Sequence, residues 1–298
     1  MKYDSFIGAS TGYRKIEYNW RDVILYALGI GANEEELDFV YEKNLKIIPT
    51  FGTIPCFNTI KNEPQRPLPY PASEILADYL RKETGKNVNG LHMSLDFRYY
   101  RPMDAVKGTL LYEDKIEHIY DWGSKGIVIT TKMPVYDEAG RLICENISTS
   151  GYFAGGEFGG PSMPKNNTII PNCVPDVIVK DAFSRTQNLL YRLSGDTNLG
   201  HVDPETAKSY GQPKPFMQGL CSYGYACRMA IKTLIPNEPE RMKRMFAQMR
   251  SIVLPGTQIE LHMWKMAEGR AVFRLVNSEN GSVILDKGEF EWDECVKK

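Results

Sequence analysis

Hydrophobic positions follow two periods along this chain, and the same succession of periods occurs twice. In the first half, apolar residues at helical spacing follow Asn19, a residue type that caps helix N-termini, and this helix ends at the Gly29/Gly31 pair. A second helix is predicted over 72–83. Alternating apolar residues then predict strands over 91–100, 108–120, 127–136 and 141–154.

The second half of the chain repeats this succession. It predicts a helix over 180–192, a short helix after Asp203 with Pro204 at its first position, and a longer helix over 216–235. Strands are then predicted over 249–253, 257–265, 271–277 and 282–292, and hairpin turns occupy equivalent positions at 137–140 and 278–281. Helices followed by antiparallel strands, twice over, predict an α+β protein with a duplicated fold.

A short internal repeat supports this duplication. The segment from Tyr26 to Asn33 matches the segment from Tyr191 to Asn198 at Tyr, Leu and Asn, with an offset of 191 − 26 = 165 residues. At this offset Gly31 stands where the second copy has Asp196, and Glu36 stands where it has His201. This asymmetry indicates that one half performs chemistry and that the other was reshaped for another role.

The composition is that of a globular protein of about two domains. The chain has 298 residues, of which 42% are hydrophobic, enough for substantial cores. Its 36 basic and 37 acidic residues give a net charge of −1, so no basic excess points to nucleic acid or a membrane surface. The glycine- and proline-rich segment 155–164 predicts a crossover linker, and it lacks the Gly-Lys-Ser/Thr of a phosphate-binding loop. The expected domains are 1–154 and 171–298, with a linker at 155–170.

Cysteine usage and the ends of the sequence indicate a compartment. The six cysteines form no Cys-x-x-Cys pair, which favours reduced thiols in a cytosol-like compartment. Residues 1–18 lack the apolar core of a signal peptide, and residues 295–298 are not a peroxisomal signal of the Ser-Lys-Leu type. The longest uncharged apolar stretch near the N-terminus is too short to span a bilayer. We therefore expect a cytoplasmic protein.

Asp196 and His201 are the residues best suited to chemistry. They lie five apart among small and turn-forming residues, so one loop can bring a carboxylate and an imidazole to the same volume, where both can hold a water. The alternative is a helix-capping aspartate beside a surface histidine. Gly219 lies at the start of the long predicted helix, where backbone N–H groups and the helix dipole can stabilise an oxyanion. The alternative for Gly219 is a glycine that only permits close packing.

Other reactive side chains do not form a recognisable site in the sequence. Cys221 and Cys227 fall on the long predicted helix without an adjacent acid–base pair, which favours buried core positions. No cluster of His, Cys and carboxylates has the spacing of metal ligands, and no dinucleotide-binding fingerprint is present. We therefore expect no metal and no tightly bound cofactor.

The motif Ser-Gly-Asp-x-Asn-x-x-His-x-Asp-Pro from Ser194 to Pro204, followed by Gly-Leu-Cys from Gly219 to Cys221, resembles the R-specific 2-enoyl-CoA hydratase family (MaoC-like dehydratases). The resemblance covers nearly the whole chain and is greatest to two-domain hydratases related to the hydratase part of the peroxisomal multifunctional enzyme. It implies a double hot-dog fold, in which two antiparallel sheets each wrap around a central helix. It also implies a catalytic C-terminal half and an N-terminal half that accommodates a bulky or long acyl chain.

The resemblance implies roles for individual residues. Asp196 and His201 correspond to the acid–base pair that activates water, and the backbone N–H of Gly219 to the donor that stabilises the enolate-like oxygen. Substrate-binding roles are implied for Asn198, His92, Tyr26 and Gln218. The implied reaction adds water to a trans-2-enoyl-CoA and gives the (3R)-3-hydroxyacyl-CoA. Coenzyme A is part of the substrate, and the implied assembly is a homodimer.

Two departures from the family pattern bear on activity. The family usually has Asn-Pro-Leu-His at residues 198–201 and His-Gly-Leu-Cys at 218–221, where this chain has Asn-Leu-Gly-His and Gln-Gly-Leu-Cys. Glycine loosens a loop that proline would stiffen, and glutamine does not titrate. Because Asp196, His201 and Gly219 are retained, we expect an active enzyme with altered specificity and not a binding protein without turnover. The same fold could also serve a thioesterase or a dehydratase of acyl-carrier-protein thioesters.

The basic cluster 241–244, on a predicted helix, is expected to be a solvated face or a contact for coenzyme A phosphates.

Overall fold

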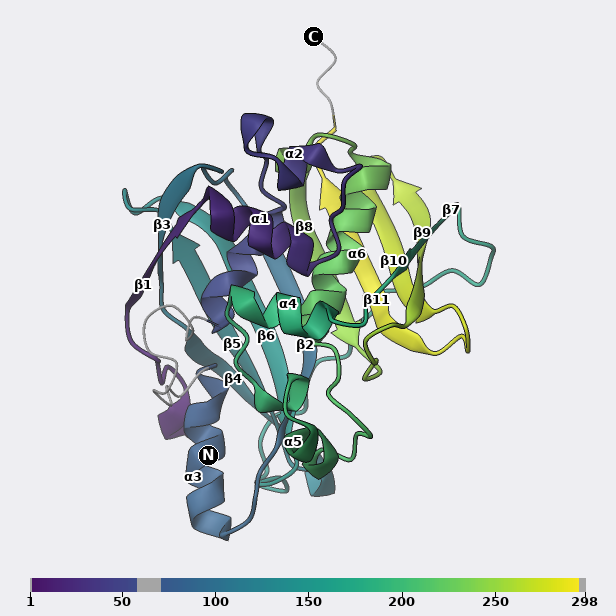
Figure 1. Ribbon diagram of the computed structural model, residues 1–298. Coiled ribbons are helices and arrows are strands. Elements are labelled where there is room, and N and C mark those ends of the chain that lie inside the picture. Colours follow the sequence, from purple (N-terminus) through teal and green to yellow (C-terminus); the bar gives the residue numbers. More distant parts are fainter. Residues whose placement is uncertain (1, 58–70, 295–298) are drawn as a thin grey trace.

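The computed structural model describes residues 2–57 and 71–294, which contain an antiparallel sheet of eleven strands (Figure 1). Ten strands follow the order β1-β3-β5-β6-β2-β8-β11-β10-β9-β7, and β4 pairs with β5 beside this path. The strands are β1 Arg14–Asn19, β2 Gly90–Tyr99, β3 Lys107–Tyr112, β4 Lys115–Asp121, β5 Ile127–Tyr136, β6 Leu142–Tyr152, β7 Val177–Ala182, β8 Met242–Met249, β9 Gln258–Ala267, β10 Arg270–Asn277 and β11 Val283–Trp292.

The helices connect the outer strands to the centre of the sheet in each half. The α-helices are α1 Trp20–Gly29, α2 Leu37–Val40, α3 Ser73–Thr84, α4 Gln187–Tyr191, α5 Pro204–Ser209 and α6 Gly219–Leu234. The 3₁₀ helices are η1 Asp4–Phe6, η2 Glu42–Asn44, η3 Pro49–Phe57, η4 Gly123–Lys125, η5 Arg192–Ser194, η6 Leu199–His201 and η7 Pro239–Arg241.

The strand order is the same in both halves when each is read from its outer edge to the centre. The order β1-β3-β5-β6-β2 of the first half corresponds to β7-β9-β10-β11-β8 of the second, and β4 is an addition to the first half. The halves join where β2 and β8 pair antiparallel, with Leu95 opposite Ala247. Figure 1 shows the sheet curving around the helices, with α6 in front of β10 and β11. The predicted α+β double hot-dog fold is therefore confirmed, with its two sheets joined edge to edge into one.

The central helix differs between the two halves. In the second half α6, of sixteen residues, contacts β8, β9 and β11. In the first half η3, a 3₁₀ helix of nine residues, contacts β2 and β6. Its approach to the sheet is so close that a Cβ on Gly52 would lie 2.7 Å from the sulfur of Cys144. The element begins at Pro49, in keeping with the tolerance of proline in the first turn of a helix.

Most predicted elements are confirmed, and a few segments differ. The helix predicted after Asn19 is α1, which begins with a reciprocal capping box between Asn19 and Asp22. The strand predicted over 108–120 is two strands, β3 and β4. The helix predicted over 180–192 is wrong in its first part, because residues up to 182 form the edge strand β7 and α4 is helical only from Gln187. The sequence prediction missed β1, whose alternation extends over only six residues.

The strand β8 occupies residues predicted to be helical, and the strand predicted over 249–253 is wrong. Met242 and Met245 are both fully buried although they lie three apart, a spacing typical of a helix. The pairing of β8 with β11 skips Lys243, so this residue is the extra residue of a β-bulge that changes the alternation. The basic cluster is also engaged within the sheet, because Arg244 forms ion pairs with Asp96, Glu289 and Glu291.

Side chains of the second half satisfy the C-terminus of α1. The last carbonyls of a helix lack intrahelical partners. Gln187 donates from Nε2 to the carbonyls of Leu28 and Gly29, at 2.9 and 2.7 Å. Arg228 donates from Nε to the carbonyl of Ile30 at 2.9 Å. The end of α1 is therefore built into the contact between the halves.

The first copy of the internal repeat contributes to the same contact. At the position equivalent to the acid, Gly31 packs so closely that a Cβ would lie 2.4 Å from the ring of Tyr225 on α6. At the position equivalent to the imidazole, Glu36 is buried and pairs with Arg228, also on α6. Both lost chemical groups are thus replaced by residues that join the two halves.

Substitution of Gly31 by alanine is expected to destabilise the protein by about 2–5 kcal/mol. Crowding in a packed core costs about 1–3 kcal/mol, and a non-glycine residue in a left-handed conformation costs about 1–2 kcal/mol more. The control is Gly140→Ala, because Gly140 has a similar φ of +75° but no atom within 4 Å of its Cβ position. Free energies of unfolding from urea titrations measure both variants, and equal losses would show that the Tyr225 contact contributes nothing.

Candidate active site

The loop between α4 and α5 is folded by its own side chains. Gly195 has a φ of +135°, a conformation that glycine adopts readily. Oδ1 of Asp196 accepts the N–H of Asn198 at 3.1 Å, and Oδ1 of Asn198 accepts the N–H of Gly200 at 2.9 Å. Two successive turns of this kind reverse the chain within a few residues. They bring the side chain of His201 back toward that of Asp196.

Asp196 and His201 form a buried pair, with 5% and 6% of their surfaces exposed. Nδ1 of His201 lies 2.9 Å from the carbonyl oxygen of Phe216. Because a carbonyl only accepts, Nδ1 carries the hydrogen and Nε2 presents a lone pair. Nε2 lies 3.8 Å from Oδ2 of Asp196. This distance is too long for a direct hydrogen bond but suits a water bonded to both atoms.

The buried position of Asp196 changes its acidity. Burial raises the pKa of its carboxyl group, and the nearby His201 and the N–H of Asn198 oppose this shift. Ionised Asp196 is the form that accepts a proton, so activity is expected to fall as the pH drops through this raised pKa. The acid limb of the kcat/KM profile is therefore expected above the usual aspartate value of about 4. A pH–rate profile tests this, and an acid limb at the ordinary value would contradict it.

Two buried amide side chains form hydrogen bonds that fix the loop carrying His201. Asn188 of α4 donates from Nδ2 to the carbonyl of His201 at 2.7 Å, and Gln218 donates from Nε2 to the carbonyl of Asn188 at 2.9 Å. Gln218, for which a substrate-binding role was predicted, is not among the described residues that line the large cavity at this site. The sequence prediction missed Asn188, because a single amide on a short helix forms part of no motif.

Aromatic packing accounts for the glycine at position 200. A Cβ on Gly200 would lie 3.1 Å from the rings of Tyr210 and Phe216, so these rings leave little room for the leucine that the family usually has. The ring of Phe216 also meets the imidazole of His201 edge-on, with 4.7 Å between the ring centroids. The imidazole is therefore fixed by a ring contact as well as by its hydrogen bond.

Gly219 is the first residue of α6 and lines the cavity beside the pair. The carbonyl of Gln218 accepts the N–H groups of Cys221 and Ser222. The N–H groups of Gly219 and Leu220 come before any intrahelical acceptor. They lie at the positive end of the helix dipole, where they can stabilise negative charge on a substrate carbonyl oxygen.

Substitution of Gly219 by proline is expected to lower kcat by about 10²–10³-fold, the usual effect of deleting one oxyanion donor. Proline removes the N–H but is favoured at the first position of a helix, and Gln218 before it is already extended, with φ −66° and ψ 136°. The matched control is Gly219→Ala, which keeps the N–H and whose Cβ would make an ordinary 3.4 Å contact with Met249. Steady-state kinetics and thermal melts of both variants test the role, and similar kcat values would contradict it.

A cavity of 480 Å³ extends from this pair into the first half of the protein. The second half contributes Asp196, Asn198, His201 and Gly219 to its walls, and the first half contributes His92. The structure therefore brings together five of the seven residues to which the sequence assigned a role.

Tyr26 lies away from this cavity. It is 1% exposed and packs against Phe51 and Tyr191, with ring centroids 5.7 and 6.2 Å apart. Tyr191 is the equivalent of Tyr26 in the internal repeat, so the two copies meet at these rings. The structure places Tyr26 in the core between the halves and not in contact with the cavity.

His92 is a neutral side chain in the first half of the cavity. Burial lowers the pKa of its imidazole to about 4. Nε2 lies 3.1 Å from the carbonyl oxygen of Ser94 and 3.0 Å from Oγ of Ser148. Because the carbonyl only accepts, Nε2 is the nitrogen that carries the hydrogen. His92 can therefore form hydrogen bonds to a ligand, but it contributes no charge near neutral pH.

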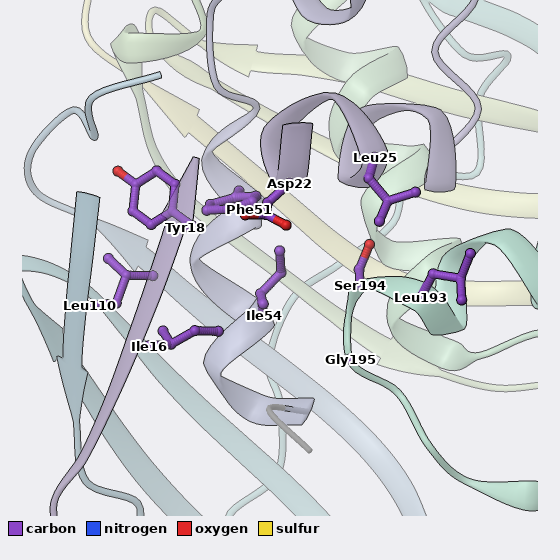
Figure 2. A pocket seen from close by; sticks show the side chains of 10 residues that line it. All are labelled: Ile16, Tyr18, Asp22, Leu25, Phe51, Ile54, Leu110, Leu193, Ser194 and Gly195. Carbon is purple, nitrogen blue, oxygen red and sulfur yellow. The ribbon is translucent and has the colours of Figure 1, made fainter. Parts of the chain in front are cut away.

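A smaller apolar cavity borders the start of the catalytic loop, as Figure 2 shows. Its walls come from β1, α1, η3 and β3 of the first half and from the η5 region of the second. The lining residues are Ile16, Tyr18, Asp22, Leu25, Phe51, Ile54, Leu110, Leu193, Ser194 and Gly195. At 20 Å³ it has room for about one water. This smaller cavity therefore cannot hold an organic substrate, whereas the cavity beside Asp196 and His201 has room for one.

The described residues contain neither a metal-binding cluster nor a membrane-spanning helix. Within 2–57 and 71–294, no group of three or more His, Cys, Asp or Glu is arranged to hold a metal ion. Over the same residues, no helix is both long enough and apolar enough to cross a membrane.

Two family models match the chain in tandem. The MFE-2 hydratase 2 N-terminal domain matches residues 16–154, and the MaoC-like domain matches residues 168–286. A probable enoyl-CoA hydratase 2 of Dictyostelium discoideum is 31% identical over 289 residues, which cover 92% of this chain and 92% of that protein. This chain belongs to the hydratase 2 family of MaoC-like proteins.

Other hydratase 2 relatives agree with this assignment. The peroxisomal multifunctional enzyme type 2 of Drosophila melanogaster is 33% identical over 278 residues, which cover 90% of this chain. The chain spans 44% of the length of that enzyme. The crystal structure of a MaoC-like dehydratase from Phytophthora capsici superposes with a TM-score of 0.81 at 30% identity, covering 99% of both chains. The family resemblance seen in the sequence is therefore confirmed.

Proposed function

We propose that this hydratase 2 family member adds water to the double bond of a trans-2-enoyl-CoA and forms the (3R)-3-hydroxyacyl-CoA. The observation that carries the proposal is the 3.8 Å separation of Asp196 Oδ2 and His201 Nε2 on a cavity that also receives the N-terminus of α6. Conjugate addition to a thioester needs a held water and donors for the carbonyl oxygen, and these groups supply both. Coenzyme A enters as part of the substrate, and water is the only co-reactant.

The proposed reaction returns the protein to its starting state. The water between Asp196 and His201 attacks C3 of the enoyl group while one of its protons passes to the pair. Negative charge moves to the thioester oxygen, where the N–H of Gly219 stabilises it. C2 then takes a proton from the pair, so the product gains one hydroxyl and one hydrogen. No group on the protein changes its net protonation.

Hydration of a panel of trans-2-enoyl-CoA thioesters tests this function. The panel should contain crotonyl-CoA, longer straight chains and branched chains, followed by the loss of enoyl absorbance. Turnover without release of free thiol is the expected result. Release of free thiol would identify a thioesterase instead, and binding without either change would identify a binding protein. Turnover confined to acyl-carrier-protein thioesters would contradict the assignment of coenzyme A.

We further propose that the chain acts as a homodimer in the cytoplasm. The family resemblance supports the dimer, and sedimentation at twice the 33.9 kDa chain mass is expected. Cys173, Cys221 and Cys227 form no disulfide, which suits a reducing compartment. Some relatives are named peroxisomal, so recovery of the native protein in a peroxisomal fraction would contradict the cytoplasmic location.

A further inference from the structure

The part of the large cavity that lies in the first half is strongly polar. Its walls come from β2, β5, β6 and the turn before β4, and they include Asn146, Ser148, Ser150, Thr131, His92 and Asp114. Asn146, Ser148 and Ser150 alternate along β6, so they share one face of the sheet. Pockets for apolar ligands are lined mainly by apolar side chains. A plain hydrocarbon chain would offer no partner to the donors and acceptors that these groups leave unused.

Asn146 has an acceptor that the protein does not satisfy. Nδ2 of Asn146 donates to the carbonyl of Gly52 at 3.1 Å. Because a carbonyl only accepts, this bond fixes which end of the amide is nitrogen. Among the residues that the structure describes, Oδ1 has no hydrogen-bond partner, and the side chain is 1% exposed. A buried polar atom without a partner is costly, so Oδ1 indicates a position where a bound molecule donates a hydrogen bond.

Two further groups that line this cavity can take part in binding a hydroxyl group. Oδ2 of Asp114 accepts the N–H of Ala72 at 2.7 Å, and burial raises the pKa of this carboxyl to about 6. In its ionised form Asp114 only accepts hydrogen bonds. Nε2 of His92, which lies 3.0 Å from Oγ of Ser148, carries the hydrogen and cannot accept, so Ser148 keeps its own hydrogen for another acceptor. A ligand hydroxyl can donate to an acceptor here and accept from Ser148 in return, whereas a ketone oxygen cannot donate.

We propose that the acyl group of the natural substrate carries a hydroxyl beyond the enoyl unit, and that this hydroxyl donates to Oδ1 of Asn146 in the polar part of the cavity. This inference rests on the proposed hydratase function, from which it takes the class of the substrate, an acyl thioester. It distinguishes a hydroxylated chain from the plain chains that the large cavity could hold by volume alone.

Matched pairs of thioesters test the inference. The pairs are ω-hydroxy and unsubstituted trans-2-enoyl-CoA esters of six to twelve carbons, and the readout is the ratio of their kcat/KM values. At the best chain length the natural protein is expected to favour the hydroxylated ester roughly tenfold or more. Asn146→Leu, which keeps the size of the side chain, is expected to remove or reverse this preference. The ratio cancels any general loss of activity in the variant.

A binding measurement separates this inference from the proposed function. Calorimetry with the natural protein compares saturated acyl-CoA esters with and without the ω-hydroxyl, which need no turnover. A tenfold tighter Kd for the hydroxylated ester would support the inference even if no thioester is hydrated. Equal affinities and equal kcat/KM values at every length would overturn it. A loss in Asn146→Leu that is the same for both members of each pair would also overturn it, because the polar wall would then hold the pantetheine arm.

Discussion

Replacement of Asp196 by asparagine is expected to lower kcat for enoyl-CoA hydration by about 10²–10⁴-fold, the usual contribution of a positioned acid–base group. Asparagine keeps the size of the side chain and can still accept the N–H of Asn198, but it cannot take a proton from water. Replacement of His201 by glutamine is expected to have an effect of similar size, because Nε2 is the second group placed to hold the same water. KM is expected to change much less than kcat, since neither group binds coenzyme A.

The matched control for this prediction is Asp203→Asn. Asp203 is also in the motif, but its Oδ2 caps α5 by accepting the N–H of Thr206 at 2.8 Å. Asparagine caps a helix about as well as aspartate, so this variant is expected to retain most of the activity. Steady-state kinetics on one enoyl-CoA compares the three variants. A kcat for Asp196→Asn within a few fold of the natural value would contradict the assignment of the pair.

Replacement of Arg228 by methionine is expected to lower the free energy of unfolding by about 3–5 kcal/mol, the usual cost of leaving a buried charge without its partner. Arg228 is 2% exposed and forms ion pairs with Glu36 and Asp181. It also donates to the carbonyl of Ile30. Methionine leaves the carboxylate of Glu36 buried among groups of the other half with no cation beside it. The loss is therefore expected to weaken the contact between the halves.

Urea titrations at neutral pH measure this effect against two comparisons. Arg141→Met removes an exposed ion pair with Asp137 and is expected to cost less than about 1 kcal/mol. Glu36→Gln added to Arg228→Met is expected to restore part of the loss, because it removes the stranded charge. A loss below about 1 kcal/mol for Arg228→Met, or no recovery in the double variant, would show that this cluster does not hold the halves together.

Local sequence patterns were sufficient to predict the repeated order of elements and the loop that brings Asp196 and His201 together. Asp196 and His201 lie within one short segment, so their spacing and the glycines around them are visible in the sequence. The N-cap at Asn19 and the two hairpin turns are local in the same way, and the structure confirms them. The duplication was visible because Tyr26 and Tyr191 occupy equivalent positions.

The features that the sequence did not reveal depend on contacts between distant residues. The spacing of Met242 and Met245 resembles that of a helix because a β-bulge opposite β11 shifts the alternation of buried residues in β8. The bulge could not be predicted because its partner strand lies far away in the sequence. Asn188 supports His201 through a hydrogen bond that joins two elements. The unpaired oxygen of Asn146 is apparent only because Gly52, on η3, fixes the other end of the amide. A single amide in a sequence indicates neither its burial nor its partner.

The two halves divide the work of the protein. The second half supplies the acid–base pair and the start of α6, and the first half supplies the polar far wall of the cavity. In the first half, the residues at the positions of the lost pair, Gly31 and Glu36, contact α6. The two positions of the first copy that lack the acid and the imidazole therefore contribute contacts to α6 of the second half.

The configuration of the product tests the central claim most directly. The protein is incubated with trans-2-crotonyl-CoA, and the 3-hydroxybutyryl-CoA that forms is offered separately to dehydrogenases specific for the R and the S configuration. The predicted result is oxidation by the R-specific dehydrogenase alone, with product formed at least about 10²-fold more slowly when Asp196→Asn replaces the natural protein. Formation of the S product, or of the R product at an equal rate by Asp196→Asn, would contradict this account of the site.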